Sequence, residues 1–277
     1  MNRTIKELTA TVKKELESVS DAPDVEAYII LSFVLGIPKE RLYAASADYV
    51  VNSEMEEKIS RITQERERGF PLFYITGRKE FMGIEFEVDE SVLIPRPETE
   101  TLVEEALKAS DGKPLNVLDI GTGSGCIILS FLHLNEQSRG TAIDISESAL
   151  TVARKNAKRL SLESRVQFVL TDFRAFNCVH KFDLILSNPP YVKTDLVKAI
   201  KFEPIEALDG GKDGLAFYPV LIKKSFELLN PSGRLILEID EDMGTSVSAM
   251  FEATGFTNNK VIKDLRNVDR FISGEKI

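Results

Sequence analysis

The chain has 277 residues, 43% of them hydrophobic, which is enough to bury the core of one large domain or two modest ones. The formal net charge of -9 argues against a broad phosphate-binding surface, so a protein substrate fits the chain better than bulk DNA or RNA. Its two histidines and two distant cysteines lack the spacing of a metal site, and we expect no metal. No signal peptide or membrane-length apolar run is visible, so we expect a cytoplasmic protein with reduced thiols.

The first 75 residues are expected to form a helical domain, because their apolar residues recur at helical spacing. Helices are expected over residues 5–19, 24–35 and 53–68. Pro23 precedes the second helix and Gly36 follows it, as start and stop signals. Ser53 is the expected N-cap of the third helix, with Glu56 at capping-box spacing.

Residues 76–95 change to a period of two. Ile84, Phe86 and Val88 alternate with acidic residues, and Met82-Gly83 can form a turn. We therefore expect a β-hairpin that links the helical domain to the rest of the chain.

From residue 96 to residue 277, strand and helix patterns alternate, which predicts an α/β domain with a mostly parallel, doubly wound sheet. Strands are expected to begin near Asn116, Thr141, Val166, Phe182, Arg234, Lys260 and Arg270. Helices are expected over residues 98–109, 126–133, 147–160, 218–229 and 242–254. No helix separates the last two strands, so we expect them to pair antiparallel.

A glycine-rich loop follows the first of these strands. The strand candidate Leu115–Ile120 leads into Gly121-Thr122-Gly123-Ser124-Gly125, and an apolar helix candidate begins at Cys126. A strand, a glycine loop and a helix form the first unit of a nucleotide-binding α/β domain, because glycines let the backbone approach a ligand closely. The dinucleotide-binding fingerprint needs a glycine or alanine three residues after Gly123, and Cys126 stands there, so this fingerprint is absent. Cys126 is more simply explained as a core residue of the helix. The remaining pattern is acidic-x-G-x-G-x-G, with Asp119 in front.

Asp144 ends the next strand candidate, 21 residues after Gly123. A carboxylate at this place can accept hydrogen bonds from two ribose hydroxyls. Taken alone, Asp144 can equally be an acid at a helix N-terminus, since Ser146 and Glu147 open a helix there. Its combination with the glycine loop favours ribose binding.

Asn188-Pro189-Pro190-Tyr191 directly follows the apolar strand candidate Phe182–Leu186. Two prolines end the strand and place the motif at its carboxyl end, where open α/β sheets bind ligands. The Asn188 side-chain oxygen and the Pro189 carbonyl can each accept one N–H of a planar amide or exocyclic amine. Such a nitrogen is a poor nucleophile, and the two acceptors would aim its lone pair at an electrophile while an aromatic face packs the flat group. The structural alternative is a proline bend with a packed tyrosine.

Together the two motifs resemble the class I methyltransferases that use S-adenosylmethionine. The segments Leu93-Ile94-Pro95-Arg96-Pro97-Glu98-Thr99-Glu100 and Phe202-Glu203-Pro204, placed around Asn-Pro-Pro-Tyr, make the chain similar to the HemK/PrmC family over nearly its whole length. The resemblance implies a seven-stranded Rossmann-like domain behind a helical substrate-recognition domain. It also implies methyl transfer to the glutamine side-chain amide in the Gly-Gly-Gln motif of peptide chain release factors, with S-adenosylhomocysteine as the product.

The resemblance also implies roles for individual residues. Residues expected to bind the cofactor are Asp119, Gly121, Thr122, Gly123, Ser124, Gly125, Asp144, Asp172, Phe173 and Asn188. Residues expected to hold the target amide or line the substrate side are Asn188, Pro189, Pro190, Tyr191 and Arg96, and Glu203-Pro204 should lie in the substrate cleft. Phe173 is equally well explained as a core residue, and Arg96 as part of a helix start with Pro97 in the first turn.

Two segments depart from the family pattern. The stretch between Tyr191 and Phe202 is short, and Asn267-Val268 stands where a glycine is common.

The main alternative function is an adenine amino-methyltransferase acting on DNA or RNA, which shares the tetrapeptide but needs a positive groove and a way to flip the base. A catalytically inactive cofactor-binding adaptor is the third interpretation, and the presence of both Asn188 and Tyr191 counts against it. We expect a monomer without membrane or direct nucleic-acid contacts.

Overall fold

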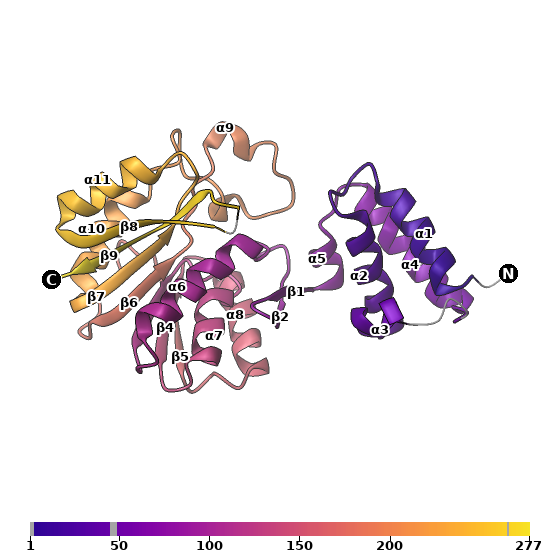
Figure 1. The fold of residues 1–277 in the computed structure, drawn as a ribbon, viewed down its shortest axis with the longest axis horizontal. Helices are drawn as coiled ribbons and strands as arrows, with labels where there is room; N and C mark the ends of the chain where they lie inside the picture. Colours follow the sequence, from indigo (N-terminus) through magenta and orange to yellow (C-terminus); the bar gives the residue numbers. More distant parts are fainter. Residues whose placement is uncertain (1–2, 45–48, 265) are drawn as a thin grey trace. The chain divides into compact units, whose positions relative to one another are not determined.

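The computed structural model describes residues 3–44, 49–264 and 266–277, and the chain divides into two compact units, residues 1–77 and 78–277 (Figure 1). The expected helical region 1–75 includes residues 1–2 and 45–48, which lie outside the described residues. Among the described residues, no helix has both the length and the apolar character needed to cross a membrane.

The first unit is helical. Its elements are α1 (Ile5–Leu16), α2 (Pro23–Leu35), α3 (Lys39–Ala44), α4 (Ser53–Glu67) and α5 (Leu72–Thr76). The predicted periodicity is confirmed, because Leu8 and Leu16 of α1 and Ile30 and Leu31 of α2 are fully buried in one apolar cluster with residues of α4. The short helices α3 and α5 were not predicted, since one or two turns are too short to show a period.

The helix ends in this unit follow capping chemistry. Pro23 opens α2, and Gly36 closes it in the left-handed conformation, as expected. The expected cap of α4 was wrong by one residue. The side chain of Asn52, and not Ser53, accepts the hydrogen bond from the Met55 amide, because Asn52 is the last residue with extended backbone.

The second unit begins with the predicted hairpin. Strands β1 (Arg78–Phe81) and β2 (Ile84–Glu87) pair antiparallel, and Met82-Gly83 form the turn with positive φ at both residues. Phe81 and Phe86 are fully buried in the core of this unit. The hairpin is thus packed into the second unit as well as being the connection from α5.

A seven-stranded sheet forms the centre of the second unit, in the order β5-β4-β3-β6-β7-β9-β8. The strands are β3 (Asn116–Ile120), β4 (Arg139–Asp144), β5 (Val166–Leu170), β6 (Phe182–Ser187), β7 (Leu229–Glu238), β8 (Phe256–Lys263) and β9 (Asp269–Lys276). All pairs from β5 to β7 are parallel, and β9 is antiparallel to both β7 and β8. The predicted mostly parallel sheet and antiparallel terminal pair are confirmed.

Helices cover both faces of this sheet. They are α6 (Glu100–Ser110), α7 (Cys126–Leu134), α8 (Glu147–Arg159), α9 (Thr194–Val197), α10 (Tyr218–Leu228) and α11 (Gly244–Thr254), with one-turn helices η1 (Pro97–Thr99) and η2 (Ile205–Ala207). Neighbouring strand residues face opposite layers: Val117 packs in a cluster with α6 and α7, and Leu118 packs in a cluster with α10 and α11. This two-sided burial explains the continuous apolar runs in the sequence.

Some strand boundaries were predicted wrongly. β7 begins at Leu229 instead of Arg234, and β8 begins at Phe256 instead of Lys260. Both early parts are irregular: Ser232 and Asn258 have positive φ, and the register shifts beside each. Residues that favour turns therefore form bulges inside these strands, between paired residues on either side.

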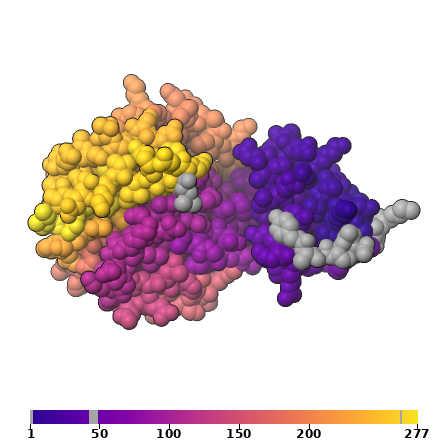
Figure 2. Space-filling view, viewed as in Figure 1, coloured from indigo at the N-terminus to yellow at the C-terminus, as the bar shows by residue number. Residues whose placement is uncertain are grey.

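The turn between β8 and β9 contacts η1, just before α6. Figure 2 shows the yellow carboxy-terminal segment against the segment near residue 100 on one face of the second unit, and the Arg266 guanidinium is 2.8 Å from the Glu98 carboxylate there. Asn267 has φ of 64°, so it adopts the left-handed conformation in which a glycine is common. The Asp264 side chain accepts from the amides of Arg266 and Val268, which stabilises this turn without a glycine.

Candidate active site

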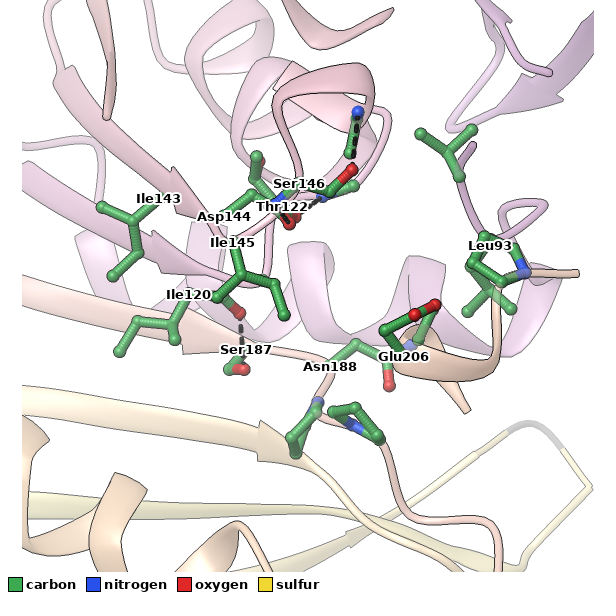
Figure 3. Close-up of a pocket in the computed structure, with 18 of the residues that line it drawn as sticks. Leu93, Ile120, Thr122, Ile143, Asp144, Ile145, Ser146, Ser187, Asn188 and Glu206 are labelled. Atoms are coloured by element: carbon green, nitrogen blue, oxygen red, sulfur yellow. Dashed lines mark hydrogen bonds between the residues drawn. The ribbon is translucent and has the colours of Figure 1, made fainter. Parts of the chain in front are cut away.

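A cavity of about 820 Å³ lies at the carboxyl edge of the sheet, in the second unit. It is lined by the glycine loop, the end of β4 and the first residues after β6 (Figure 3), and also by the loop after β5. Of the predicted site residues, the lining includes Arg96, Gly121, Thr122, Gly123, Ser124, Asp144, Asp172, Phe173, Asn188, Pro189 and Pro190. Motifs far apart in the sequence therefore share one cavity, because parallel strands end at the same edge.

Three predicted site residues are not part of this lining: Asp119, Gly125 and Tyr191. Gly125 is the N-cap of α7 at φ of 80°, and a Cβ there would lie 2.9 Å from Leu129 Cδ1. Gly125 therefore allows the backbone at the start of α7 to pack closely against the Leu129 side chain. Asp119 and Tyr191 lie behind the cavity wall and contact residues that line it or support it.

The glycine loop is held by main-chain hydrogen bonds from the neighbouring strand. The amides of Gly121 and Thr122 both donate to the Ile143 carbonyl, at 2.9 and 3.1 Å. Gly121 and Gly123 have φ of 74° and 53°, and a Cβ at either position would meet no atom within 4 Å. These two glycines therefore present bare backbone to the cavity in a conformation that other residues resist.

Asp144 joins the glycine loop to the start of α8. One carboxylate oxygen accepts from the Gly123 amide at 2.9 Å, and the other accepts from the Ser146 amide at 2.9 Å. Ser146 is the N-cap of α8 and accepts from the Ala149 amide. The helix-start role is thus present in the structure. Each Asp144 oxygen keeps a further lone pair, so this role leaves acceptor capacity at the cavity.

Asp119 is fully buried at the end of β3. Its Oδ2 accepts from the Thr122 hydroxyl at 2.7 Å, and within the described part of the chain Oδ1 has no hydrogen-bond partner. Burial raises the pKa of Asp119 to about 7. Burial also raises the pKa of the neighbouring Cys126 to about 12, so its thiol stays protonated in the core.

Aromatic side chains form the side of the cavity that follows β5. The Phe173 and Phe217 rings are 6.3 Å apart, and the Arg174 guanidinium lies 5.1 and 5.4 Å from their centroids. Asp172 holds that arginine by an ion pair of 3.1 Å and accepts from the Arg174 amide. Phe173 is half-buried against the core and also lines the cavity, so its position agrees with either expectation and its role in cofactor binding stays a prediction.

Ile145 and Phe217 line the cavity but were not predicted from the sequence as site residues. Ile145 is 59% exposed although it directly follows Asp144 at the end of β4. An exposed branched apolar residue after a buried strand is the signal that could have indicated a surface for a flat ligand. Phe217 had no such signal, because its neighbours Tyr218 and Leu215 pack in the core beside it.

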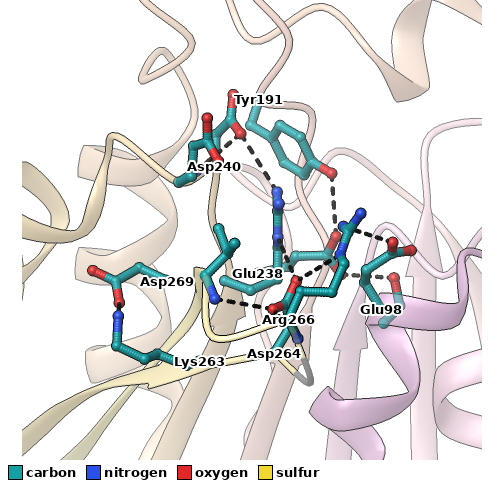
Figure 4. Close-up of polar contacts among 12 residues, drawn as sticks. Glu98, Tyr191, Glu238, Asp240, Lys263, Asp264, Arg266 and Asp269 are labelled. Atoms are coloured by element: carbon teal, nitrogen blue, oxygen red, sulfur yellow. Dashed lines mark hydrogen bonds and ion pairs between the residues drawn. The ribbon is translucent and has the colours of Figure 1, made fainter.

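Asn188 is the first residue after β6, and the NH2 group of its side chain is hydrogen-bonded to the protein. Its Nδ2 donates to the Thr99 hydroxyl at 3.4 Å, and the Thr99 hydroxyl donates to Glu238 Oε2 at 2.7 Å. The Tyr191 hydroxyl donates to the other Glu238 oxygen at 3.2 Å (Figure 4). The motif is therefore anchored to two residues, Thr99 and Glu238, that were not predicted as site residues. The signal in the sequence was a single charged residue, Glu238, within the apolar run of β7.

The backbone of the motif is packed by the loop that follows it. The Gly210 amide donates to the Val192 carbonyl at 2.8 Å. A Cβ at Gly214, where φ is 80°, would lie 2.4 Å from the Tyr191 carbonyl oxygen. The loop can therefore approach Pro190 and Tyr191 this closely only with glycine, which restricts the motif to one conformation.

Arg96 and Glu203 bring the two remaining family-like segments together. Arg96 forms an ion pair with Glu203, whose other oxygen accepts from the Ile94 amide at 3.1 Å. Arg96 is also the residue before η1, with Pro97 in its first turn. Arg96 therefore lines the cavity and opens a helix at once. No group of three or more His, Cys, Asp or Glu side chains among the described residues is arranged to hold a metal ion.

This arrangement of sheet, glycine loop and Asn-Pro-Pro-Tyr defines a methyltransferase domain. Residues 111–268 match the family described as methyltransferase domain, and residues 7–77 match the family described as PrmC N-terminal domain. The fold is shared with the crystal structure of a methyltransferase from Pyrococcus furiosus, with a TM-score of 0.51 and 20% identity over 70% of this chain and 90% of that one.

Curated relatives identify the family of methyltransferases to which the chain belongs. The release factor glutamine methyltransferase of Caulobacter vibrioides is 35% identical, over 98% of this chain and 96% of the relative. That of Moorella thermoacetica is 38% identical, over 90% of each chain. The chain belongs to the family of release factor glutamine methyltransferases, which confirms the resemblance to the HemK/PrmC family.

Proposed function

We propose that this chain transfers a methyl group from S-adenosylmethionine to the glutamine side-chain amide in the Gly-Gly-Gln motif of peptide chain release factors. The observation that carries the proposal is the Asn188 amide, held through its NH2 group at the edge of a cavity that also contains the glycine loop and Asp144. The names of the relatives supply the substrate class.

The residues of the cavity fit the methyl donor. Gly121 and Gly123 offer bare backbone to its amino-acid end, and the spare lone pairs of Asp144 suit two ribose hydroxyls. Asp172, Phe173 and Ile145 line the cavity and would contact the adenine, and Asp119 would support the glycine loop from behind through Thr122. When bound, S-adenosylmethionine supplies a methyl group on a sulfonium cation.

The part of this chain in the reaction is to orient the target nitrogen. With Nδ2 of Asn188 occupied by Thr99, the Asn188 oxygen is free to accept one N–H of the glutamine amide, and the Pro189 carbonyl accepts the other. The two acceptors hold the amide plane so that the nitrogen lone pair points at the methyl group. Tyr191 lies behind the cavity wall and anchors the motif through Glu238, and Arg96 lines the cavity on the substrate side.

The same proposal includes the setting of the reaction. The described residues of the first unit, 3–44 and 49–77, carry no part of the cavity, and we assign this unit to recognition of the release factor. A monomer in the cytoplasm, where translation takes place, completes the proposal. The net charge of -9 disfavours direct nucleic-acid binding, and thus the adenine methyltransferase alternative.

Labelled S-adenosylmethionine tests the proposal. The purified protein is offered a release factor, the same release factor with its motif glutamine changed to alanine, total RNA and DNA. Label is expected only in the unchanged release factor, on the glutamine nitrogen. Label in DNA or RNA would instead support the adenine alternative, and label in the altered release factor would place the reaction on another residue.

The affinity for S-adenosylmethionine is expected to fall by about tenfold or more in Asp144→Ala. The substitution removes the acceptor for two ribose hydroxyls, and a hydrogen bond to a charged group contributes about 1.5–3 kcal/mol. Calorimetry measures the affinity, and circular dichroism checks that the fold is intact. Asn52→Ala, which also removes a main-chain cap but in the first unit, serves as the control. An unchanged affinity in Asp144→Ala would remove Asp144 from the ribose site.

A further inference from the structure

Glu238 lies at the end of β7, behind the Asn-Pro-Pro-Tyr motif, and its side chain does not line the cavity. The residue is 1% exposed, and its two carboxylate oxygens bind the Thr99 and Tyr191 hydroxyls. Thr99 ends η1, before α6, and Tyr191 follows β6, so one carboxylate joins three segments that are distant in the sequence. The Tyr218 hydroxyl adds a bond of 2.8 Å to the Glu238 carbonyl and secures the backbone at this point.

The direction of the hydrogen bonds follows from the chemistry of the groups. An ionised carboxylate only accepts, so the single hydroxyl hydrogen of Thr99 must point at Glu238. The Thr99 oxygen then has only lone pairs left, and it can bind the NH2 group of Asn188 but not the amide oxygen. The carboxylate therefore determines which end of the Asn188 amide faces the protein, and the amide oxygen is left for the substrate.

On this basis, and resting on the proposed function, we propose that Glu238 and Thr99 are positioning residues for methyl transfer. Glu238 acts through Thr99 to keep the Asn188 oxygen toward the target nitrogen, and it holds the Tyr191 phenol beside it. Neither residue touches the reacting atoms. Loss of either is expected to reduce the rate of the chemical step more than the binding of either substrate.

The surroundings of Glu238 explain why a glutamine would be a more stable residue there. Burial raises its pKa to about 7, against hydrogen bonds from Thr99 and Tyr191 that lower it. Among the described residues, the charged or titratable groups that act on it from the packed elements are Glu98, Cys126, Tyr191, Tyr218 and Arg270. Arg270, the cation among them, is 3.4 Å from Asp240 and 3.8 Å from Asp264. The Glu238 carboxylate is thus retained with little direct compensation.

The sign of the pH effect on stability follows from this shift. The unfolded chain loses the Glu238 proton near the ordinary glutamate pKa, whereas the folded protein keeps it until about pH 7. Folding is therefore opposed increasingly as pH rises between these two values, and the full penalty applies above pH 7. Glu238→Gln is expected to have a higher Tm than the parent at pH 8 and a smaller difference at pH 5.

The kinetic test uses Thr99→Val, which keeps the shape of the side chain and removes the hydroxyl. The expected result is a kcat at least about tenfold lower than that of the parent. The affinity for S-adenosylmethionine and the KM for release factor should stay within about twofold of the parent. Thr99→Ser restores the hydroxyl and should recover most of the rate. Thr254→Val, which removes a hydroxyl bonded to a main-chain carbonyl in α11, is the matched control.

Glu238→Gln separates a positioning role from a structural one. A glutamine has one acceptor oxygen and an NH2 group that only donates, so the Thr99 and Tyr191 hydroxyls cannot both donate to it. The variant is expected to lower kcat while raising Tm at pH 8, and its combination with Thr99→Val should cost less than the product of the two single effects, because both act through Asn188. Parental kcat in both Glu238→Gln and Thr99→Val, or a Glu238→Gln variant that loses kcat and stability together, would overturn the proposal.

A measurement without substrate keeps this inference distinct from the proposed function. The side-chain 15N amide resonances of Asn188 are followed by NMR between pH 5 and 9. They are expected to titrate near pH 7 in the parent, and this titration should vanish in Glu238→Gln and in Thr99→Val. If the parent titrates but does not methylate the release factor, the proposed function fails and the positioning network stands. If Asn188 does not respond to either substitution, the network fails whatever the enzyme methylates.

Discussion

Asn188→Ala is expected to lower the turnover of release factor methylation by at least about 100-fold, with the affinity for S-adenosylmethionine changed by less than about twofold. The alanine has no acceptor for the target amide, and misplacing a reacting group by about 1 Å can cost 100-fold in rate. On the transition-state scale this corresponds to about 2.7 kcal/mol. Single-turnover kinetics measures the rate, and calorimetry measures the cofactor affinity.

Asn188→Asp is the sharper form of this test. A carboxylate can accept a hydrogen bond from the target amide, but it cannot donate one to Thr99, whose only hydrogen points at Glu238. Two carboxylates would then share one hydroxyl hydrogen. The new charge would also attract the sulfonium in the ground state, and this attraction fades as the methyl group leaves. We expect unchanged or tighter cofactor binding with much slower turnover.

Asn177→Asp provides the matched control, since Asn177 is an exposed asparagine in the loop after β5 that bonds Lys224 and a main-chain carbonyl. It should keep parental turnover. Near-normal turnover in Asn188→Asp would show that Asn188 does not orient the nitrogen, and the motif would then have only its structural role as a proline bend.

Residues 78–277, produced alone, are expected to bind S-adenosylmethionine with nearly parental affinity but to methylate the release factor with kcat/KM at least tenfold lower. The fragment contains every residue that lines the cavity, together with the buried hairpin β1–β2. It lacks the helical unit that we assign to partner recognition, so the loss should appear mainly as a higher KM.

Calorimetry and a full titration of release factor check this prediction, and the intact chain prepared in parallel is the control. Retained affinity for S-adenosylmethionine confirms that the fragment is folded. Methylation by such a fragment at the parental kcat/KM would show that the first unit does not recognise the substrate. A fragment that loses kcat at saturating release factor would indicate that the first unit acts on the catalytic step.

Much of the fold could be predicted because its signals are local. Continuous apolar runs such as Phe182–Leu186 predicted strands buried on both faces, and the helix between Pro23 and Gly36 followed from its flanking residues. The errors were local too. The turn-forming residues near Ser232 placed the start of β7 too late, because they form a bulge between two paired residues, Leu229 and Arg234, and the strand continues through it.

Much of the cavity could also be predicted from the sequence, since residues that follow parallel strands meet at one edge of the sheet. The glycine loop, Asp144 and Asn188 were brought together in this way. Tyr191 and Asp119 were predicted as site residues but lie behind the wall of the cavity. Whether a side chain after a strand points into a cavity or back into the core depends on its rotamer and neighbours, which no sequence spacing determines.

The sequence by itself determined the fold class, the family and the residues at the sheet edge, because periodicity, turns and motif spacing depend on neighbours along the chain. The tertiary structure alone decided that Glu238 accepts from Thr99, 139 residues away, and that Thr99 in turn binds Asn188. Hydrogen bonds are directional and extend only about 3 Å, so their partners are determined by how the layers pack. The orientation of the Asn188 amide was decided at that level.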